Sequence, residues 1–333
     1  MKTKVKWNES YGIYSEKGVR KAYKGHEGNV ADINLMLTSM LRFAGLNANP
    51  VLISTRNNGV PAFPTIDGFN YVISMVEFSD NTHVLLDATE VYSLPNILPL
   101  RDLNWNGRKV TKEGLSSWVA LTSEKPALEE NFMRVKITDD LVIEGVLRTK
   151  IDNVKAMNFR IQNNHLKEEN IISSLESEYK IEIDNFKITN NDKINKPISR
   201  IMSFISEDSI EEINGKLYVN PLLFFATTTN PFKLEERKFP VDFGTPWKDV
   251  NNISIAIPNG YKVASLPAPL AIGLPENLGV FKFQVKQMGN SIAAISSLAF
   301  NKAMISPQYY EILKKFYGDL VEKQSEKITL VKE

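Results

Sequence analysis

The stretch from Gly28 to Thr89 constrains the fold more than any other part of the chain, because it predicts one long helix followed by three strands. Apolar residues recur three and four positions apart from Val30 to Ala44, which is the spacing of one helical face. Asn29 is a favourable N-cap and Gly45 a favourable helix stop. Further apolar residues widen the face, so we expect most of the helix to be buried. The expected buried face comprises Val30, Ile33, Leu35, Met36, Leu37, Met40, Leu41, Phe43 and Ala44.

Three strand signals follow this helix. Val51–Ser54 and Tyr71–Phe78 are apolar and partly β-branched, which is typical of strands. Ser79–Asn81 has the composition of a turn, and His83–Leu86 returns from it. The turn makes the last two strands antiparallel, so the stretch predicts one helix and an antiparallel sheet.

Three short motifs in this stretch resemble those of the transglutaminase-like superfamily. They are Gly-x-x-x-Asp from residue 28, Phe-Asn-x-Val-Ile from residue 69 and Leu-Asp-x-Thr from residue 86. The resemblance covers residues 20–120 and points to a bacterial branch with an extra β-rich domain downstream. It implies an α+β fold with a papain-type core, in which a nucleophile at a helix N-terminus faces a base and an orienting acid on neighbouring strands.

The residues at the superfamily's catalytic positions do not support its chemistry. Val30 stands where the family has Cys, and Tyr71 stands where it has His; only Asp87 matches the third member, an acid. An acyl intermediate needs a thiolate or an activated hydroxyl with a base beside it. A tyrosine, with a pKa of about 10, is a poor base at neutral pH, and the chain has no cysteine at all. We therefore predict that the acyl-transfer activity is lost.

Length and composition fit an ordinary globular protein of two or three domains. The chain has 333 residues and a formal net charge of +1, which gives no reason to expect nucleic acid as a partner. No apolar run approaches the roughly 18–20 residues that span a bilayer, so no transmembrane segment is expected. The absence of cysteine, the scattered histidines and the lack of nucleotide- or metal-binding motifs predict no metal and no cofactor.

The polar segment Ser123–Glu130 predicts a domain boundary. Residues 1–122 are expected to form the degenerate transglutaminase-like domain, and residues 128–333 a β-sandwich accessory domain with a C-terminal helix. Within the second part, Ala156–Ile161 shows the alternation of a strand. Ser306 and the proline after it open the last helix.

The resemblance also indicates where a ligand would bind. The loop Asn57–Gly68 corresponds to one that borders the substrate cleft of the resembling enzymes, which makes Phe63 a candidate cleft residue. Asn29, Tyr71 and Asp87 are the other candidates. The leading hypothesis is a non-catalytic module that binds or scaffolds a peptide or protein.

Two other functions stay open on the sequence. One is a peptidase, amidase or acyltransferase whose chemistry is rebuilt around Asp87, Tyr71, Asn29 and His83; a perturbed carboxylate in a water-filled cleft favours it. The other is a purely structural assembly protein, which a large exposed apolar patch within residues 131–333 favours.

The N-terminus carries no export signal that the sequence reveals. Met1–Lys6 is basic, but no hydrophobic region follows it, so we expect no signal peptide in this chain. Members of the superfamily branch usually carry an export signal and a β-domain upstream of the helix. The resemblance therefore implies export to the periplasm or cell surface, and a chain that begins inside a larger architecture.

Overall fold

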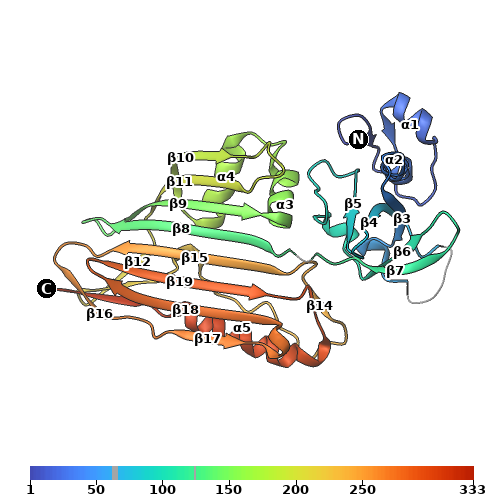
Figure 1. The fold of residues 1–333 in the computed structure, drawn as a ribbon. Helices are drawn as coiled ribbons and strands as arrows, with labels where there is room; N and C mark the ends of the chain where they lie inside the picture. The colour runs from blue at the N-terminus through green and yellow to red at the C-terminus, as the bar shows by residue number, and fades with distance from the viewer. Residues whose placement is uncertain (62–66, 124) are drawn as a thin grey trace. The chain divides into compact units, whose positions relative to one another are not determined.

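The computed structural model describes residues 1–61, 67–123 and 125–333 (Figure 1). The chain divides into two units, Met1–Lys125 and Pro126–Glu333. Both units combine helices with largely antiparallel sheets. The protein is therefore α+β, as the sequence predicts.

The first unit contains a five-stranded antiparallel sheet. Its elements are β1 (Lys6–Trp7), α1 (Val19–Gly25), β2 (Glu27–Gly28), α2 (Val30–Phe43), β3 (Asn47–Ile53), η1 (Arg56–Asn58), β4 (Tyr71–Glu77), β5 (His83–Leu86), η2 (Leu100–Asp102), β6 (Asn106–Val110) and β7 (Ser116–Ala120). The strand order is β5-β4-β3-β6-β7. The start of α2 shares a buried cluster with β3 and β4, so this helix is packed on the sheet.

Helix α2 begins as predicted, with Asn29 as its cap. The Asn29 side chain accepts a hydrogen bond from the backbone of Asp32 at 2.8 Å, and the Asp32 carboxylate accepts one from the backbone of Asn29 at 3.2 Å. This reciprocal capping box satisfies two amides that the helix leaves without partners. The helix ends at Phe43, and Gly45 takes the left-handed conformation expected of a stop, with φ of 84°.

The predicted burial of α2 is wrong for its C-terminal half. Met40 is 52% exposed and Phe43 is 95% exposed. Two polar residues face the sheet instead: Asn34 donates to the carbonyl of Val72 at 2.9 Å, and the Thr38 hydroxyl lies 2.8 Å from that of Ser74. Hydrogen bonds to β4 thus set the orientation of the helix, and the apolar stripe alone does not.

The capping box gives a first test. Asn29→Ala should lower the free energy of unfolding by about 1 kcal/mol, because alanine offers no acceptor to the backbone of Asp32. Asn29→Ser keeps an acceptor and should lose less. Both variants also lose the bond from the Asn29 amide to the Tyr14 carbonyl, so their difference in urea denaturation isolates the cap. Equal stabilities for the two variants would show that the cap contributes nothing.

The second unit contains an eight-stranded and a four-stranded sheet. Its elements are β8 (Ala127–Ile137), β9 (Ile143–Asp152), α3 (Asn153–Asn163), α4 (Glu168–Tyr179), β10 (Glu182–Thr189), β11 (Ile198–Ser206), β12 (Ile210–Ile213), β13 (Lys216–Val219), β14 (Val241–Asp242), β15 (Trp247–Ala256), β16 (Tyr261–Ser265), β17 (Leu270–Gly273), β18 (Gly279–Met288), β19 (Ser291–Phe300), β20 (Met304–Ile305), α5 (Tyr310–Ser325) and β21 (Ile328–Lys332). The larger sheet has the order β10-β11-β9-β8-β15-β19-β18-β17, and the smaller β12-β13-β21-β16. Strands β8 and β15 are parallel.

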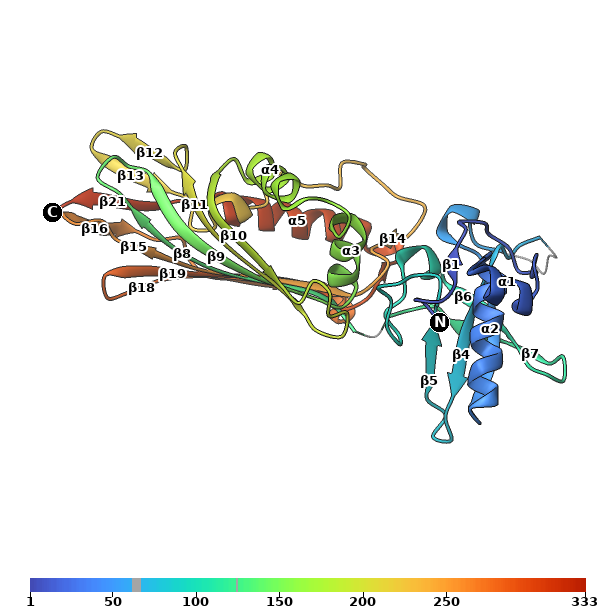
Figure 2. The ribbon, with the colours of Figure 1, turned by 90° about the horizontal axis from the view of Figure 1, so that it is seen from above.

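One buried cluster joins the inner faces of both sheets with helices α4 and α5. Phe300 of β19 lies 6.1 Å from the ring of Phe316 and 6.0 Å from that of Tyr317, both on α5. Leu217 and Leu330 bring the smaller sheet into the same cluster. The helices and the smaller sheet lie on one side of the larger sheet (Figure 2), whose other face is left uncovered by them.

Residues 156–161, predicted as a strand, belong to helix α3. The Asp152 side chain accepts a hydrogen bond from the backbone of Asn153 at 2.8 Å, which starts a helix at this point. Ala156, Met157 and Arg160 are buried with helical spacing. The prediction failed because six residues are too few to distinguish the two periods when a cap precedes them.

Candidate functional site

Val30, Tyr71 and Asp87 come together in the first unit. Val30 is the first residue of α2, Tyr71 the first of β4, and Asp87 directly follows β5. Val30 and Tyr71 belong to one buried cluster and are 0% exposed, while Asp87 is 2% exposed. These three residues therefore lie in a closed part of the core.

The Asp87 carboxylate accepts hydrogen bonds from four residues. Its Oδ1 accepts from the Asn34 side chain at 2.8 Å and from the Thr89 backbone at 2.9 Å. Its Oδ2 accepts from the Tyr71 hydroxyl at 3.0 Å and lies 3.3 Å from Nη2 of Arg101. A buried carboxylate is tolerated only when it is paired and hydrogen-bonded, and here both oxygens are satisfied.

Aromatic rings from the N-terminal segment lie against this cluster. The guanidinium of Arg101 is 4.9 Å from the ring centroid of Trp7 and 5.8 Å from that of Tyr71, in cation–π geometry. Tyr11 packs 5.4 Å from Trp7 and 5.6 Å from Tyr71. These rings fill the space beside Tyr71.

The Tyr71 hydroxyl is a donor at this site. Burial raises the pKa of Tyr71 far above its usual value, and the neighbouring Asp87 and Asp102 carboxyls raise it further. Its oxygen also lies 2.6 Å from the Thr89 hydroxyl. A phenol that keeps its proton can hold Asp87 in place but cannot remove a proton from a nucleophile.

Asp102 is a second carboxyl beside this network. It is 0% exposed, and neither of its oxygens accepts a hydrogen bond from a described residue, while its protonated carboxyl is hydrogen-bonded to Asp87. Nε of Arg101 lies 3.8 Å from its Oδ1. Burial raises the pKa of Asp102 well above the usual range, and the nearby Asp87 charge raises it further.

The structure does not bring the other candidate residues into this network. Asn29 caps α2, and its amide donates to the carbonyl of Tyr14 at 2.8 Å. His83 is exposed and pairs with Glu77 across β5 and β4. Phe63 lies outside the described residues. Of the candidate cleft residues that the structure describes, only Tyr71 and Asp87 therefore belong to this network, and both are buried.

Sequence reasoning missed three members of the network. Asn34 carried a usable signal, because it is a polar residue one helical turn after Val30 in an apolar run. Arg101 and Asp102 carried none, since they follow Pro99 in a segment without periodic pattern.

The described residues contain no cluster of three or more His, Asp or Glu side chains arranged to bind a metal ion. Over the same residues, no helix has both the length and the apolar character that a membrane span requires.

Comparison with known proteins adds a domain family and a fold. Residues 215–330 match DUF3858, a domain of unknown function with a solved structure. The chain also resembles the crystal structure of a protein from Parabacteroides distasonis ATCC 8503 described as a "putative protease", with a TM-score of 0.50 and 11% sequence identity. That match covers 98% of this chain and 49% of the other, so this chain spans about half the length of its structural neighbour. No curated protein matches the sequence. At this identity the likeness concerns the fold alone.

The hydrogen bonds of Asp87 make it a structural acceptor, and substitution tests this. Asp87→Ala should lower the free energy of unfolding by about 3–5 kcal/mol, because it leaves buried donors and the Arg101 charge without their partner. Asp87→Asn keeps one carbonyl oxygen and should lose less. Asp139→Ala, at an exposed turn, is the control and should be near neutral in urea denaturation. Unchanged stability in both Asp87 variants would exclude the structural role.

The raised pKa of Asp102 predicts a pH dependence of stability. The folded state holds a proton on Asp102 that the unfolded state has released above its ordinary pKa of 3.8. Its contribution to stability is therefore complete below that value and is lost as pH rises toward the folded pKa. Asp102→Asn carries no such proton, so its stability relative to wild type should increase from about pH 4 to about pH 8. A difference that stays constant in urea denaturation over this range would contradict the raised pKa.

Proposed function

We propose that this chain is a catalytically degenerate member of the transglutaminase-like superfamily, of its bacterial, exported branch, and that it binds or scaffolds a peptide or protein. The observation that carries the proposal is the closed cluster of Val30, Tyr71 and Asp87. Val30 offers no nucleophile, Tyr71 offers no base, and the Asp87 carboxylate is engaged by donors on both oxygens.

The arrangement of elements supports the superfamily assignment. The papain-type core places a nucleophile at a helix start and the other two members on neighbouring strands. Here α2 begins at the first position, β4 begins at the second, and β5 ends beside the third. The likeness to the Parabacteroides structure supports the fold, and the description of that protein suggests peptide as the class of ligand. A chain that lacks the chemistry would hold such a peptide without cleaving it.

One observation speaks for the alternative of a rebuilt enzyme. Asp102 is a carboxyl with a raised pKa, which is a common mark of catalytic sites. It is nevertheless wholly buried beside Arg101. A group that water and substrate do not reach cannot exchange a proton with them, so we favour the non-catalytic function.

Enzyme assays test the proposal directly. The purified chain should neither incorporate an amine into peptide glutamine nor cleave peptides, because no nucleophile faces a base. Turnover that persists through purification and disappears in Asp87→Asn would overturn the proposal.

A cysteine probe of the closed cluster accompanies this assay. The chain has no cysteine, so Val30→Cys introduces a single thiol at the position of the family's nucleophile. That thiol should react with Ellman's reagent only after denaturation, whereas Val19→Cys, at an exposed site, should react at once. Fast labelling of the folded Val30→Cys variant would show that the cluster is open.

A further inference from the structure

The uncovered face of the eight-stranded sheet carries unusually large apolar side chains. We call this the outer face; it is the side opposite α5 and the smaller sheet (Figure 2). Phe132, Val146 and Ile295 lie on it, each 44–48% exposed. The solvated face of an antiparallel sheet is normally polar, so three exposed apolar residues on central strands need an explanation.

These apolar residues alternate with arginines across neighbouring strands. Phe132 of β8 lies opposite Arg148 of β9, and Arg134 of β8 lies opposite Val146 of β9. Side chains that oppose each other directly are roughly 5 Å apart. Ile295 continues the row of Phe132 across β15, since both pair with Asn252. The centre of the outer face is thus a mixed patch of two cations and three apolar side chains.

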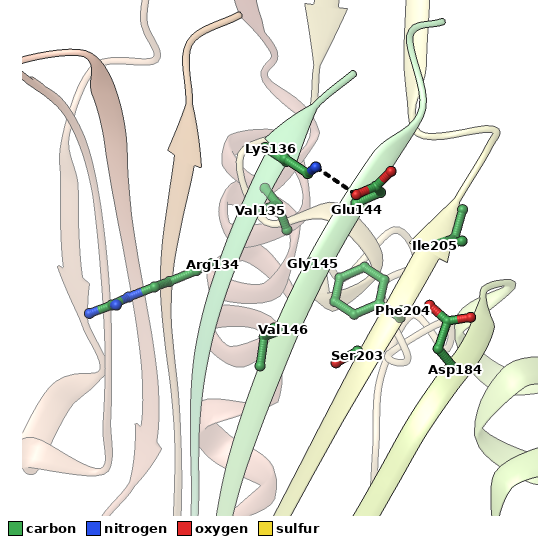
Figure 3. Close-up of a pocket in the computed structure, with 10 residues that line it drawn as sticks. All are labelled: Arg134, Val135, Lys136, Glu144, Gly145, Val146, Asp184, Ser203, Phe204 and Ile205. Carbon is green, nitrogen blue, oxygen red and sulfur yellow. Dashed lines mark ion pairs between the residues drawn. The ribbon is translucent and has the colours of Figure 1, made fainter. Parts of the chain in front are cut away.

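The charges of this patch are not balanced within the described residues. The rows on either side hold ion pairs, Lys150 with Glu130 at 2.9 Å and Lys136 with Glu144 at 2.8 Å. Arg134 and Arg148 are exposed, and neither forms an ion pair with a described residue. Figure 3 shows Arg134 extending away from the Lys136–Glu144 pair. The patch is therefore a positive band between two neutral ones.

Two hollows open on the patch and share part of their lining. One has a volume of about 590 Å³ and the other about 630 Å³, and Arg134 and Val146 line both. Asn252 and Ser254 add hydrogen-bonding groups to the second hollow. A volume of this order accommodates several side chains of a ligand.

We propose that the outer face binds an acidic peptide segment with apolar side chains; this deepens, and rests on, the proposed binding function. Carboxylates of the segment pair with Arg134 and Arg148, whose planar guanidinium groups match a carboxylate in two-pronged geometry. Its apolar side chains cover Phe132, Val146 and Ile295. Arginine and aromatic residues of this kind are the usual anchors of protein interfaces.

The pattern of charge favours a peptide over a continuous polyanion. Glu130 and Glu144 border the patch, and Asp184 lines one hollow. Glu130 and Glu144 are paired with lysines, and Asp184 forms no ion pair with a described residue, so a continuous polyanion along the sheet would meet the Asp184 charge. A segment with two well-spaced carboxylates meets the arginines and avoids the acids.

Peptide binding by the whole chain tests this site. The probe is a short fluorescent peptide that alternates glutamate with leucine and phenylalanine, and its partner peptide has lysine in place of glutamate. Fluorescence anisotropy should show binding of the acidic peptide only. Arg134→Glu/Arg148→Glu should weaken it about tenfold or more, and Phe132→Ala should weaken it as well. These side chains are exposed, so circular dichroism should show an unchanged fold.

A charge-matched control and the outcomes that would contradict the proposal complete the experiment. Arg237→Glu/Lys238→Glu makes the same charge change in the exposed segment next to α5 and should leave binding intact. Absence of acidic-peptide binding, equal binding of the lysine peptide, or an undiminished affinity in Arg134→Glu/Arg148→Glu would overturn the site. Binding to phosphatidylglycerol vesicles alone would assign the outer face to a membrane and overturn the peptide site. Self-association of the chain that Arg134→Glu/Arg148→Glu abolishes would assign the face to a second copy and overturn the peptide site as well. Peptide turnover would refute the proposed non-catalytic function while leaving this site standing.

Discussion

The buried carboxylate of Asp87 is the constraint on which the first unit depends. It draws its donors from separate elements: Asn34 from the middle of α2, Tyr71 from the start of β4 and Arg101 from η2. Asn34 also donates to the carbonyl of Val72 and accepts from the backbone of Ala88. Removing the charge of Asp87 from water is favourable only if these donors are in place, so the carboxylate fixes how the helix, the sheet and η2 meet.

The same network accounts for the closed packing around Val30, Tyr71 and Asp87. A working triad needs room for a substrate and a base that exchanges protons, and both are features that reduce stability. Here Val30 adds apolar volume to the buried cluster, and the Tyr71 hydroxyl donates a hydrogen bond to the Asp87 carboxylate. Val30 and Tyr71 therefore make the contacts of an ordinary protein core.

The sequence alone predicts those features of the fold whose signals lie within a few neighbouring residues. Asn29 and Gly45 defined the limits of α2, and the turn at Ser79–Asn81 predicted the β4–β5 hairpin, because caps and turns act within a few residues. The sequence does not predict which residues from distant segments form hydrogen bonds with each other. The orientation of α2 follows from hydrogen bonds of Asn34 and Thr38 to β4, and Arg101 reaches Asp87 from a segment without a pattern. Alternation along β8 and β9 also predicts which side chains share a face, but only the strand register places each arginine opposite an apolar residue.

The two units handle unbalanced charge in opposite ways. In the first unit the charge is buried: Asp102 lies beside Arg101 and Asp87, burial raises its pKa, and it therefore takes up a proton on folding whose stabilising contribution is lost as pH rises. In the second unit the unbalanced groups are Arg134 and Arg148, which are exposed beside apolar side chains. An exposed charge without an ion pair can form one with a ligand, whereas a buried charge cannot be reached. The physical argument for binding therefore concerns the outer face of the larger sheet and not the buried cluster around Tyr71 and Asp87.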